Sequence, residues 1–294
     1  MKAVDFDYVR VASVKEACRL LADRGEEAKL IAGGQTLVPL LAMRLARPSL
    51  LIDISGIAEL KGMVLEDGQL EIGACTRQAE ALRDASLRRE VPLLAKALAF
   101  VGHGQTRNRG TVGGSLANAD PAAEIGLAAV TLDAEMAARS SVGERRIAAE
   151  QFFTGPMTTA LVLGECLAAV RFPRRPRAGG YGTGFKEMST RRSDFALVAV
   201  AAEVLLDREG TCARAAIGVG GVGGKPQKAA AAATRLLGTR VAPDDVAAAA
   251  RLLADAIEPQ TDLYASADYR RRLAGAMAER ALAEARDEAI GEGA

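Results

Sequence analysis

Short apolar runs alternate with amphipathic stretches along the first part of the chain. Ser13 and Glu16 have the spacing of a capping box, which predicts a helix that Gly25 ends. A second helix is expected over residues 37–45. The apolar runs predict strands over residues 6–12, 29–31 and 50–54. The pattern therefore predicts a β-α-β unit, with a Gly-Gly pair shortly before its second helix.

The middle of the chain mixes hairpin and helix patterns. Asp67-Gly68 separates two strand-like runs, residues 63–66 and 69–72, and this dipeptide is typical of a hairpin turn. Residues 102–109 are polar throughout, and we predict a loop there. Further strands are expected over residues 132–138, 145–148 and 166–172, and helices over residues 76–85, 91–101 and 122–130.

A segment rich in Arg, Pro and Gly, residues 171–180, interrupts this pattern and is the best candidate for a linker. It is either a solvated loop or a basic docking patch for a partner subunit. Beyond it we expect strands over residues 183–188, 195–206 and 212–219, and Ala-rich helices over residues 229–237, 243–256 and 269–286. The predicted fold class is α+β, with units over residues 1–55, 56–175 and 180–290.

Composition narrows the class of protein. Of the 294 residues, 49% are hydrophobic and 26% are charged, as in ordinary globular proteins. The formal net charge of +1 gives no global field that favours nucleic acid. No apolar run is long enough to cross a bilayer, and the first residues lack the apolar region of a secretion signal. We therefore expect a cytoplasmic protein that neither binds nucleic acid nor inserts into a membrane.

The cysteines and the single histidine exclude several kinds of site. The four cysteines lie far apart and form no C-x-x-C pair, namely Cys18, Cys75, Cys166 and Cys212. This spacing argues against a disulfide framework and against an iron–sulfur cluster in this chain. His103 has no clustered cysteine, so we predict no metal site. His103 itself either orders its loop or lies near a ligand.

Two Gly-Gly pairs lie next to hydroxyl residues and lead into helices. The first is in Ile31-Ala-Gly-Gly-Gln-Thr36, and the second is in Gly110-Thr-Val-Gly-Gly-Ser-Leu-Ala-Asn-Ala-Asp-Pro-Ala-Ala-Glu124. Glycine lets backbone N–H groups approach a ligand, and N–H groups at a helix start bind anions. Asp120-Pro121 is expected to cap and open the helix of the second stretch. Two such loops fit a ligand with two phosphates, such as a dinucleotide, whereas the glycines of residues 218–224 are expected to form a turn.

These motifs resemble those of a known family. The segments are Ala32-Gly-Gly-Gln-Thr36, residues 107–124, residues 184–195 and Asp268-Tyr-Arg-Arg. In combination they resemble the FAD-binding subunits of molybdenum hydroxylases, the xanthine dehydrogenase and carbon monoxide dehydrogenase group. The resemblance implies a two-part FAD-binding domain of the vanillyl-alcohol oxidase and cell-wall reductase type. It also implies an α+β C-terminal flavoprotein domain.

The resemblance also implies roles for individual residues. The two Gly-Gly loops would wrap the FAD pyrophosphate through backbone N–H groups, and Asn118 and Glu124 would contact the ribityl or adenosine side. Lys186 would be the catalytic residue near the flavin, although it could instead be ion-paired with Glu187 or Asp194. Other members have a Tyr-x-Lys-Phe pattern where this chain has Phe185-Lys-Glu-Met188. The expected cofactor-binding residues are Ala32, Gly33, Gly34, Gln35, Thr36, Leu37, Asn108, Thr111, Val112, Gly113, Gly114, Ser115, Asn118, Asp120, Glu124, Leu167 and Lys186.

By the same resemblance, this chain is the medium subunit of a three-subunit enzyme. Its partners would be a small subunit with [2Fe–2S] clusters and a large molybdopterin subunit, and FAD would pass electrons to an external acceptor. The substrate of the complex is expected to be an N-heterocycle. Two alternatives stay open: a self-contained flavin oxidase that tethers its flavin through His103, and a non-catalytic nucleotide-binding scaffold.

Overall fold

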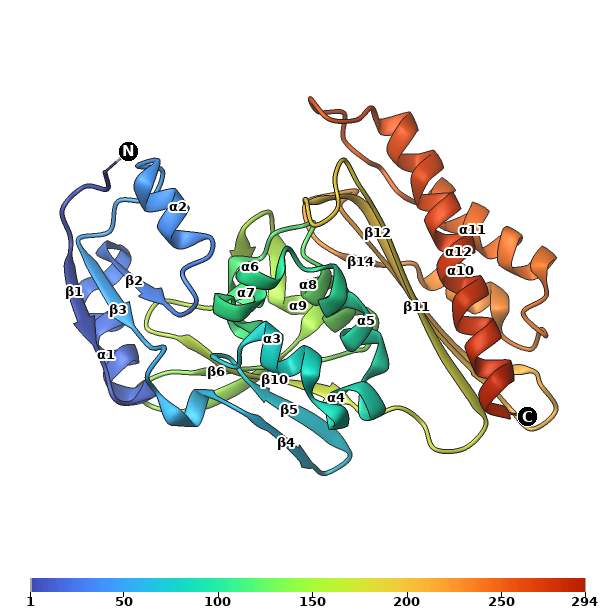
Figure 1. The fold of residues 1–294 in the computed structure, drawn as a ribbon, viewed down its shortest axis with the longest axis horizontal. Helices are drawn as coiled ribbons and strands as arrows, with labels where there is room; N and C mark the ends of the chain where they lie inside the picture. The colour runs from blue at the N-terminus through green and yellow to red at the C-terminus, as the bar shows by residue number, and fades with distance from the viewer. Residues whose placement is uncertain (1, 294) are drawn as a thin grey trace.

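Three larger sheets lie in a row in the computed structural model, which describes residues 2–293 (Figure 1). The first sheet is parallel, with β3 (Leu50–Asp53) between β1 (Asp7–Arg10) and β2 (Ala28–Ile31). Helix α1 (Val14–Arg24) follows β1, and α2 (Leu37–Ala42) follows β2. The predicted β-α-β unit is confirmed. Ser13 caps α1 as predicted, because the Glu16 N–H donates to Ser13 Oγ at 3.2 Å. The reciprocal bond of the predicted capping box differs, because Glu16 Oε2 accepts from the Ala12 N–H at 3.1 Å and not from that of Ser13.

The second sheet is antiparallel and forms the middle of the molecule. Its strands in order are β4 (Met63–Glu66), β5 (Gln69–Gly73), β10 (Cys166–Pro173), β6 (Glu135–Arg139) and β7 (Glu144–Ala148). The predicted hairpin is confirmed, since Asp67 and Gly68 both have positive φ, 48° and 75°. Smaller elements complete these two units: η1 (Gly25–Glu27) joins α1 to β2 in the first unit, and η2 (Ala58–Leu60) precedes β4. After β7 come α9 (Ala149–Phe152), β8 (Phe153–Gly155) and β9 (Thr158–Thr159).

Six helices lie between the second and third sheets. They are α3 (Gln78–Arg83), α4 (Ala85–Glu90), α5 (Pro92–Phe100), α6 (Gly104–Arg109), α7 (Val112–Asn118) and α8 (Glu124–Thr131). Helix α7 packs on β5 and β10, whereas α5 and α8 pack on strands of the third sheet (Figure 1). The helices therefore join the middle unit to the C-terminal unit through a shared apolar core.

Three sequence predictions in this region are wrong. The polar residues 102–109 form α6 from Gly104 rather than a loop, because its last-turn side chain Arg107 bonds the preceding carbonyls of Val101 and Gly102 at 2.8 and 2.7 Å. Asp120-Pro121 does not open a helix. Helix α7 begins earlier, at Val112 with Thr111 as its cap, and α8 begins later, at Glu124. The predicted strand 132–138 begins only at Glu135, after a turn.

The third sheet carries helices on its outer face. Its strands are β11 (Gly180–Ser189), β12 (Ala196–Leu206), β13 (Cys212–Gly220) and β14 (Gln227–Lys228), and its helices are α10 (Ala230–Leu236), α11 (Pro243–Ala256) and α12 (Ala267–Gly293). A Cβ on Gly182 or Gly184 would lie 1.9 Å from a carbonyl oxygen of α12. Glycine at alternate positions of β11 therefore lets α12 lie directly on the strand.

The two faces of β12 belong to different cores. Val198, Val200 and Ala202 are buried with α11 and α12, whereas Ala199 and Ala201 are buried in the core of the middle unit. Because side chains alternate along a strand, the register of β11 against β12 assigns each β11 side chain to one of these two faces. This assignment decides the surroundings of the charged residues of β11.

The arginines of the proposed linker are bound within the chain. Arg174 and Arg177 bind Glu90, whose side chain is 1% exposed, at 2.8 and 3.1 Å. Arg171 pairs with Glu71 at 2.5 Å, and Arg175 pairs with Glu292 at 2.6 Å. These contacts tie the segment to both neighbouring units, so it is not the free basic docking patch that one interpretation of the sequence allowed.

Within residues 2–293, none of the helices combines the length and the hydrophobicity needed to cross a membrane. The α+β mixture of helix and strand that the sequence predicted is confirmed.

Candidate cofactor site

The two Gly-Gly segments meet between the first and second units. We call residues 31–36 the first glycine loop and residues 110–115 the second glycine loop. A Cβ on Gly33 would lie 2.4 Å from the carbonyl oxygen of Arg109 and 2.9 Å from Cα of Gly110. Backbones approach this closely only where a side chain is absent. The fold therefore brings together two segments that are far apart in the sequence.

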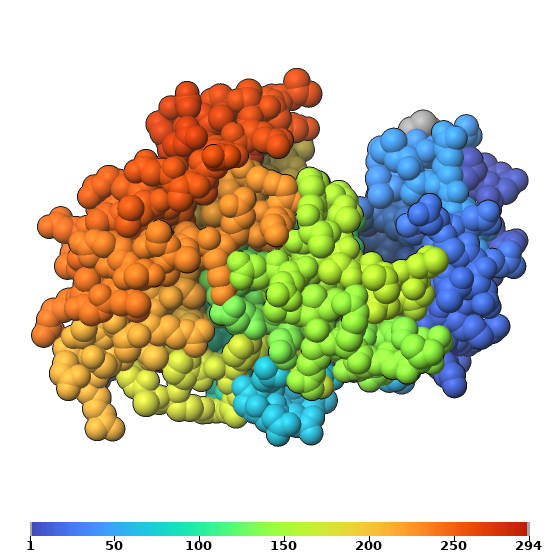
Figure 2. Space-filling view, turned by 180° about the vertical axis from the view of Figure 1, so that it is seen from behind, coloured from blue at the N-terminus to red at the C-terminus, as the bar shows by residue number. Residues whose placement is uncertain are grey.

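A cleft of about 700 Å³ opens beside this contact. Figure 2 shows the molecule hollowed between the N-terminal unit and the middle of the chain. Four of the expected cofactor-binding residues line the cleft, namely Ala32, Gly33, Gly34 and Gln35. The other lining residues are Tyr8, Arg10, Ile31, Val38, Pro39, Asp53, Ser55, Arg77 and Arg109. Three arginines and one carboxylate give the cleft a net positive charge, which suits an anionic ligand.

The first glycine loop offers free donors to this cleft. Within residues 2–293, the N–H groups of Gly33, Gly34, Gln35 and Thr36 have no hydrogen-bond acceptor. Gly34 has a φ of +72°, in the left-handed region that favours glycine. Consecutive free N–H groups next to a helix start form an anion-binding concavity. The geometry of the loop therefore fits a phosphate group.

The second glycine loop differs, because the chain uses its N–H groups. Those of Val112 and Gly113 donate to the carbonyls of Thr76 and Ala74 at 3.0 and 2.9 Å. Those of Gly114 and Ser115 donate to the side chain and carbonyl of Thr111 at 3.0 and 3.1 Å. These bonds fix the loop on β5. The prediction that this loop also wraps a pyrophosphate stays a prediction, with fewer free donors than the sequence suggested.

Gly113 has a packing role that the sequence did not reveal. A Cβ at this position would lie 2.3 Å from the Cβ of Ala74, whereas on the exposed Gly114 it would approach only the Thr111 hydroxyl, at 2.6 Å. The glycine pair therefore lets α7 lie against β5. The parts of the loop that remain accessible to solvent are the exposed Gly114 and the half-buried Ser115.

The residues after the second loop turn sharply before α8. Ala119 is in the left-handed conformation, with a φ of 51°, and its carbonyl accepts from the Met157 N–H at 3.0 Å. Asp120 accepts from the Ala122 N–H at 2.9 Å and so stabilises this turn instead of capping a helix. Asn118 lies within 4.0 Å of the Met157 sulfur. Left-handed non-glycine residues store strain that is common at functional sites.

Glu124 begins α8 and is largely removed from solvent. Burial raises the pKa of Glu124 to about 7, and the charge of Asp120 raises it further, while Arg107 lowers it. A carboxyl group with this pKa exchanges protons near neutral pH. Its position agrees with the expected contact to a cofactor, which stays a prediction.

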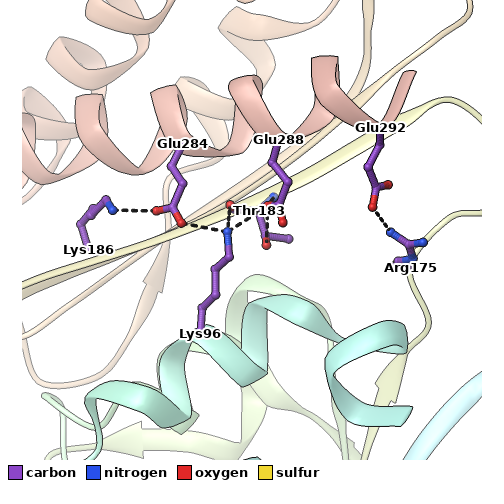
Figure 3. A network of polar contacts seen from close by, with 7 residues as sticks. All are labelled: Lys96, Arg175, Thr183, Lys186, Glu284, Glu288 and Glu292. Carbon is purple, nitrogen blue, oxygen red and sulfur yellow. Dashed lines mark hydrogen bonds and ion pairs between the residues drawn. The ribbon is translucent and has the colours of Figure 1, made fainter. Parts of the chain in front are cut away.

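Lys186 is bound to α12 rather than to the partners expected from the sequence. Its Nζ pairs with Glu284 Oε2 at 2.8 Å (Figure 3), and it lies opposite Val200, on the α12 face of the sheet. The expectation that Glu187 or Asp194 is its partner is wrong, because strand alternation turns Glu187 to the other face and Asp194 binds Arg191 at 3.2 Å.

Glu187 occupies the face that looks toward the middle unit. It lies opposite Ala199, which is buried in the middle core, and its Oε2 is buried with no hydrogen-bond partner. Burial, with a smaller contribution from the charge of Glu124, raises the pKa of Glu187 to about 8. The sequence analysis missed Glu187 as a site residue, although the period of two along β11 could have indicated its direction.

The remaining expected residues lie apart from the cleft lining. Leu167 is 4% exposed in the middle core, Asn108 is exposed on α6, and Thr36 and Leu37 begin α2. His103 is exposed just before α6, its side chain makes no cap hydrogen bond, and it is not among the residues that line the cleft. In the described part of the chain the four cysteines are buried free thiols, and no cluster of His, Cys, Asp and Glu could hold a metal ion.

Sequence reasoning missed the arginines of the cleft. Tyr8 and Arg10 are two residues apart on β1 and so share a face, a signal that the strand pattern could have given. Arg77 donates to the carbonyl of Arg109, which links the start of α3 to the second glycine loop. This contact between distant segments had no signal in the sequence.

Comparison with known proteins gives the same assignment. Residues 4–175 match the family described as FAD binding domain in molybdopterin dehydrogenase, and residues 183–285 match the CO dehydrogenase flavoprotein C-terminal domain. The chain is 41% identical over 285 residues to the alpha subunit of the 6-hydroxypseudooxynicotine dehydrogenase complex of Paenarthrobacter nicotinovorans, covering 97% of this chain and 96% of that protein.

Solved structures agree over the whole length. Carbon monoxide dehydrogenase of Hydrogenophaga pseudoflava superposes with a TM-score of 0.94 at 33% identity, covering 98% of this chain and 99% of that chain. Quinoline 2-oxidoreductase from Pseudomonas putida 86 superposes with a TM-score of 0.93 at 38% identity, covering 99% of this chain and 100% of that chain. The chain thus belongs to the family of FAD-binding medium subunits of molybdenum hydroxylases.

Proposed function

We propose that this chain is an electron-transfer subunit that receives electrons from [2Fe–2S] clusters and passes them through FAD to an external acceptor. The observation that carries the proposal is the first glycine loop: within residues 2–293 the N–H groups of residues 33–36 have no hydrogen-bond acceptor, and Gly33, Gly34 and Gln35 line a cleft that three arginines also line. This donor set fits the diphosphate of FAD. The redox chemistry would belong to the flavin, and the chain would bind, orient and shield it.

Residues of the chain would hold different parts of the cofactor. Gly33, Gly34, Gln35 and Thr36 would donate backbone N–H groups to the diphosphate, with Arg77 and Arg109 adding positive charge. An apolar pocket of about 280 Å³ adjoins the cleft and shares Tyr8, Ile31 and Val38 with it, which suits the adenine ring. Ser115, Asn118 and Glu124 would lie along the ribityl chain toward the flavin. We keep the two-part domain of the vanillyl-alcohol oxidase type as part of this proposal.

Lys186 remains the proposed cation near the flavin, but its charge is balanced by Glu284. A paired charge exerts a weaker field than a free one, so its effect on the flavin would be smaller than a free lysine would produce. Leu167 and Asn108 remain proposed cofactor contacts through their position in the motif match.

The partners would be an iron–sulfur small subunit and a molybdopterin large subunit in the cytoplasm. Relatives named for a dehydrogenase complex and for a quinoline oxidoreductase support this assembly. Quinoline is an N-heterocycle, which supports an N-heterocyclic substrate for the complex here.

The test is FAD retention by the purified chain. Arg77→Met and Arg109→Met should each weaken FAD binding about tenfold, the loss of one charge-assisted contact of ~1.4 kcal/mol. Arg208→Met is the matched control, because Arg208 is exposed in the turn between β12 and β13, in a different unit from the cleft. FAD binding that is equal in all three variants would overturn the placement of the diphosphate, and a wild-type chain that cannot be loaded with FAD would overturn the proposed function.

A further inference from the structure

The three strands of the first sheet end together at the cleft. The sheet is parallel, and its central strand β3 ends at Asp53, which pairs with Arg10 of β1 on one side and Ile31 of β2 on the other. Neighbouring strands lie about 5 Å apart, and the first glycine loop begins at Ile31. Ligands of open parallel sheets bind beyond the carboxyl ends of the strands. Asp53 is therefore next to the loop that is proposed to bind the diphosphate.

The side chain of Asp53 is fixed by the protein. Among the described residues that line the cleft, Asp53 carries the single carboxylate, and it is 8% exposed. Its Oδ2 accepts from the Tyr8 hydroxyl at 2.5 Å, and its Oδ1 accepts from the Ser55 N–H at 2.8 Å. Burial alone would raise the pKa of Asp53, but these hydrogen bonds and the nearby charge of Arg10 outweigh it and hold the pKa below its ordinary value. The group is therefore ionised at neutral pH and can only accept hydrogen bonds.

The Asp53 carboxylate has room for further hydrogen bonds. A carboxylate has about four acceptor positions, and within residues 2–293 the protein fills two of them. A negative charge with little exposure repels a phosphate, but it forms strong hydrogen bonds with hydroxyl groups that donate to it. The ligand group that fits beside Asp53 is therefore a neutral donor, such as a pair of adjacent hydroxyls, while the arginines of the cleft attract the phosphates.

Tyr8 shows where this carboxylate lies along the nucleotide site. Tyr8 is 58% exposed and lines both the cleft and the apolar pocket that is proposed for adenine. Because the Tyr8 hydroxyl binds Asp53, the carboxylate lies where the pocket and the cleft meet. In FAD, the group that joins adenine to the diphosphate is a ribose, which carries two adjacent hydroxyls. The ribose thus matches Asp53 both in position and in chemistry.

We propose that Asp53 binds the ribose hydroxyls of the adenosine half of FAD, an inference that rests on the proposed function. Tyr8 is a positioning residue, because its hydroxyl orients the carboxylate. A flavin mononucleotide has no adenosine and cannot make this contact, and a phosphate group on the ribose would meet the charge of Asp53. Asp53 therefore selects an adenine dinucleotide without a phosphate on its ribose.

The first experiment compares two fragments of the cofactor on the FAD-free chain. ADP carries the diphosphate and both ribose hydroxyls, and 2′,3′-dideoxy-ADP differs only by lacking the hydroxyls. Calorimetric titration of the wild-type chain should show about 30-fold weaker binding of the dideoxy compound, because the carboxylate loses its donors. Equal affinities for the two compounds would overturn the proposal, and so would a chain that binds FAD but not ADP. A chain that binds neither FAD nor ADP would overturn the proposed function.

The second experiment tests whether Asp53 itself causes this difference. Asp53→Asn keeps the shape of the side chain and removes its charge, so the ratio of the two affinities should fall to about threefold. The ratio is the correct readout because both compounds carry the same phosphates, so any change in attraction for the diphosphate cancels. Asp207→Asn is the matched control, since Asp207 also accepts backbone N–H groups in a turn, at 3.0 and 2.8 Å, but in the C-terminal unit.

A further variant covers the case in which Asp53→Asn does not fold. Tyr8→Phe changes an exposed side chain and removes only the hydroxyl that orients the carboxylate. It should lower the ratio to about tenfold, whereas Asp207→Asn should keep the wild-type ratio. A wild-type ratio in both Asp53→Asn and Tyr8→Phe, or in Tyr8→Phe alone when Asp53→Asn does not fold, would refute the role of Asp53.

Discussion

The two glycine loops have similar sequences but different roles in the structure. Within residues 2–293, the first glycine loop leaves the N–H groups of residues 33–36 without acceptors, and Gly33, Gly34 and Gln35 line a positively charged cleft. The second glycine loop has acceptors for the N–H groups of residues 112–115, and its Gly113 is needed to pack on Ala74. A Gly-Gly pair therefore indicates close approach of a backbone, and the approaching group can be a ligand or the protein itself.

Gly113→Val is expected to have the largest effect, which is a loss of stability. A Cβ 2.3 Å from the Ala74 side chain forces α7 away from β5, and overpacking of this kind costs about 3 kcal/mol. The melting temperature of the FAD-free chain should fall by about 6–12 °C. Gly143→Val is the control, because nothing lies within 4 Å of a Cβ there. Equal melting temperatures of Gly113→Val and Gly143→Val would contradict the packing role.

Gly34→Val should instead act on the cofactor. Valine does not readily adopt a φ of +72°, so the first glycine loop should lose its free N–H array and FAD affinity should fall about 100-fold, or ~2.7 kcal/mol. Gly68→Val has the same strain, at a φ of +75°, in the hairpin between β4 and β5 and outside the cleft. Titration of FAD into both variants separates backbone strain from loss of binding. An equal loss of FAD affinity in both variants would contradict the binding role of the first glycine loop.

Thr111→Val tests the second glycine loop with a smaller change. It removes the hydroxyl that caps α7 by accepting from the Gly114 N–H at 3.0 Å, at a cost of about 1 kcal/mol. The melting temperature should fall by about 2–4 °C, while FAD binding stays close to that of wild type. If this variant lost as much FAD as Gly34→Val, the two loops would be equivalent in binding after all.

The smallest expected effect is a pH dependence at the end of the second stretch. Burial raises the pKa of Glu124 to about 7, so between pH 4.5 and 7 the folded chain holds a proton that the unfolded chain releases. Stability from this group is therefore full below pH 4.5 and declines as the pH rises through 7. Because Glu124 keeps part of its surface in water, which screens much of this shift, Glu124→Gln should flatten the decline by only about 2 °C in melting temperature between pH 4.5 and 7, measured without FAD. An unchanged pH profile would mean that Glu124 ionises freely.

Sequence patterns located both glycine loops, the helix cap at Ser13 and the hairpin at Asp67-Gly68, because each depends on neighbouring residues alone. They misplaced the helix starts around the second loop. Asp120-Pro121 has the local chemistry of a helix start, but the Asp120 side chain is used in a turn beside the left-handed Ala119. The Asp-Pro pattern is typical of a helix start, but the packing of α7 on β5 decides where the helices around it begin and end.

The sequence alone determined the family and the residues that form the two glycine loops, since both can be recognised from short motifs. The surroundings of each charged residue were decided only by the tertiary structure. Lys186 and Glu187 are neighbours in the sequence, yet the register of β11 against β12 places Lys186 beside Glu284 and Glu187 toward Glu124. Strand alternation is local, but the identity of the two faces depends on which helices cover the sheet. Those helices come from distant segments, since Lys96 of α5 and Glu284 of α12 are 188 residues apart, and no local pattern specifies their docking.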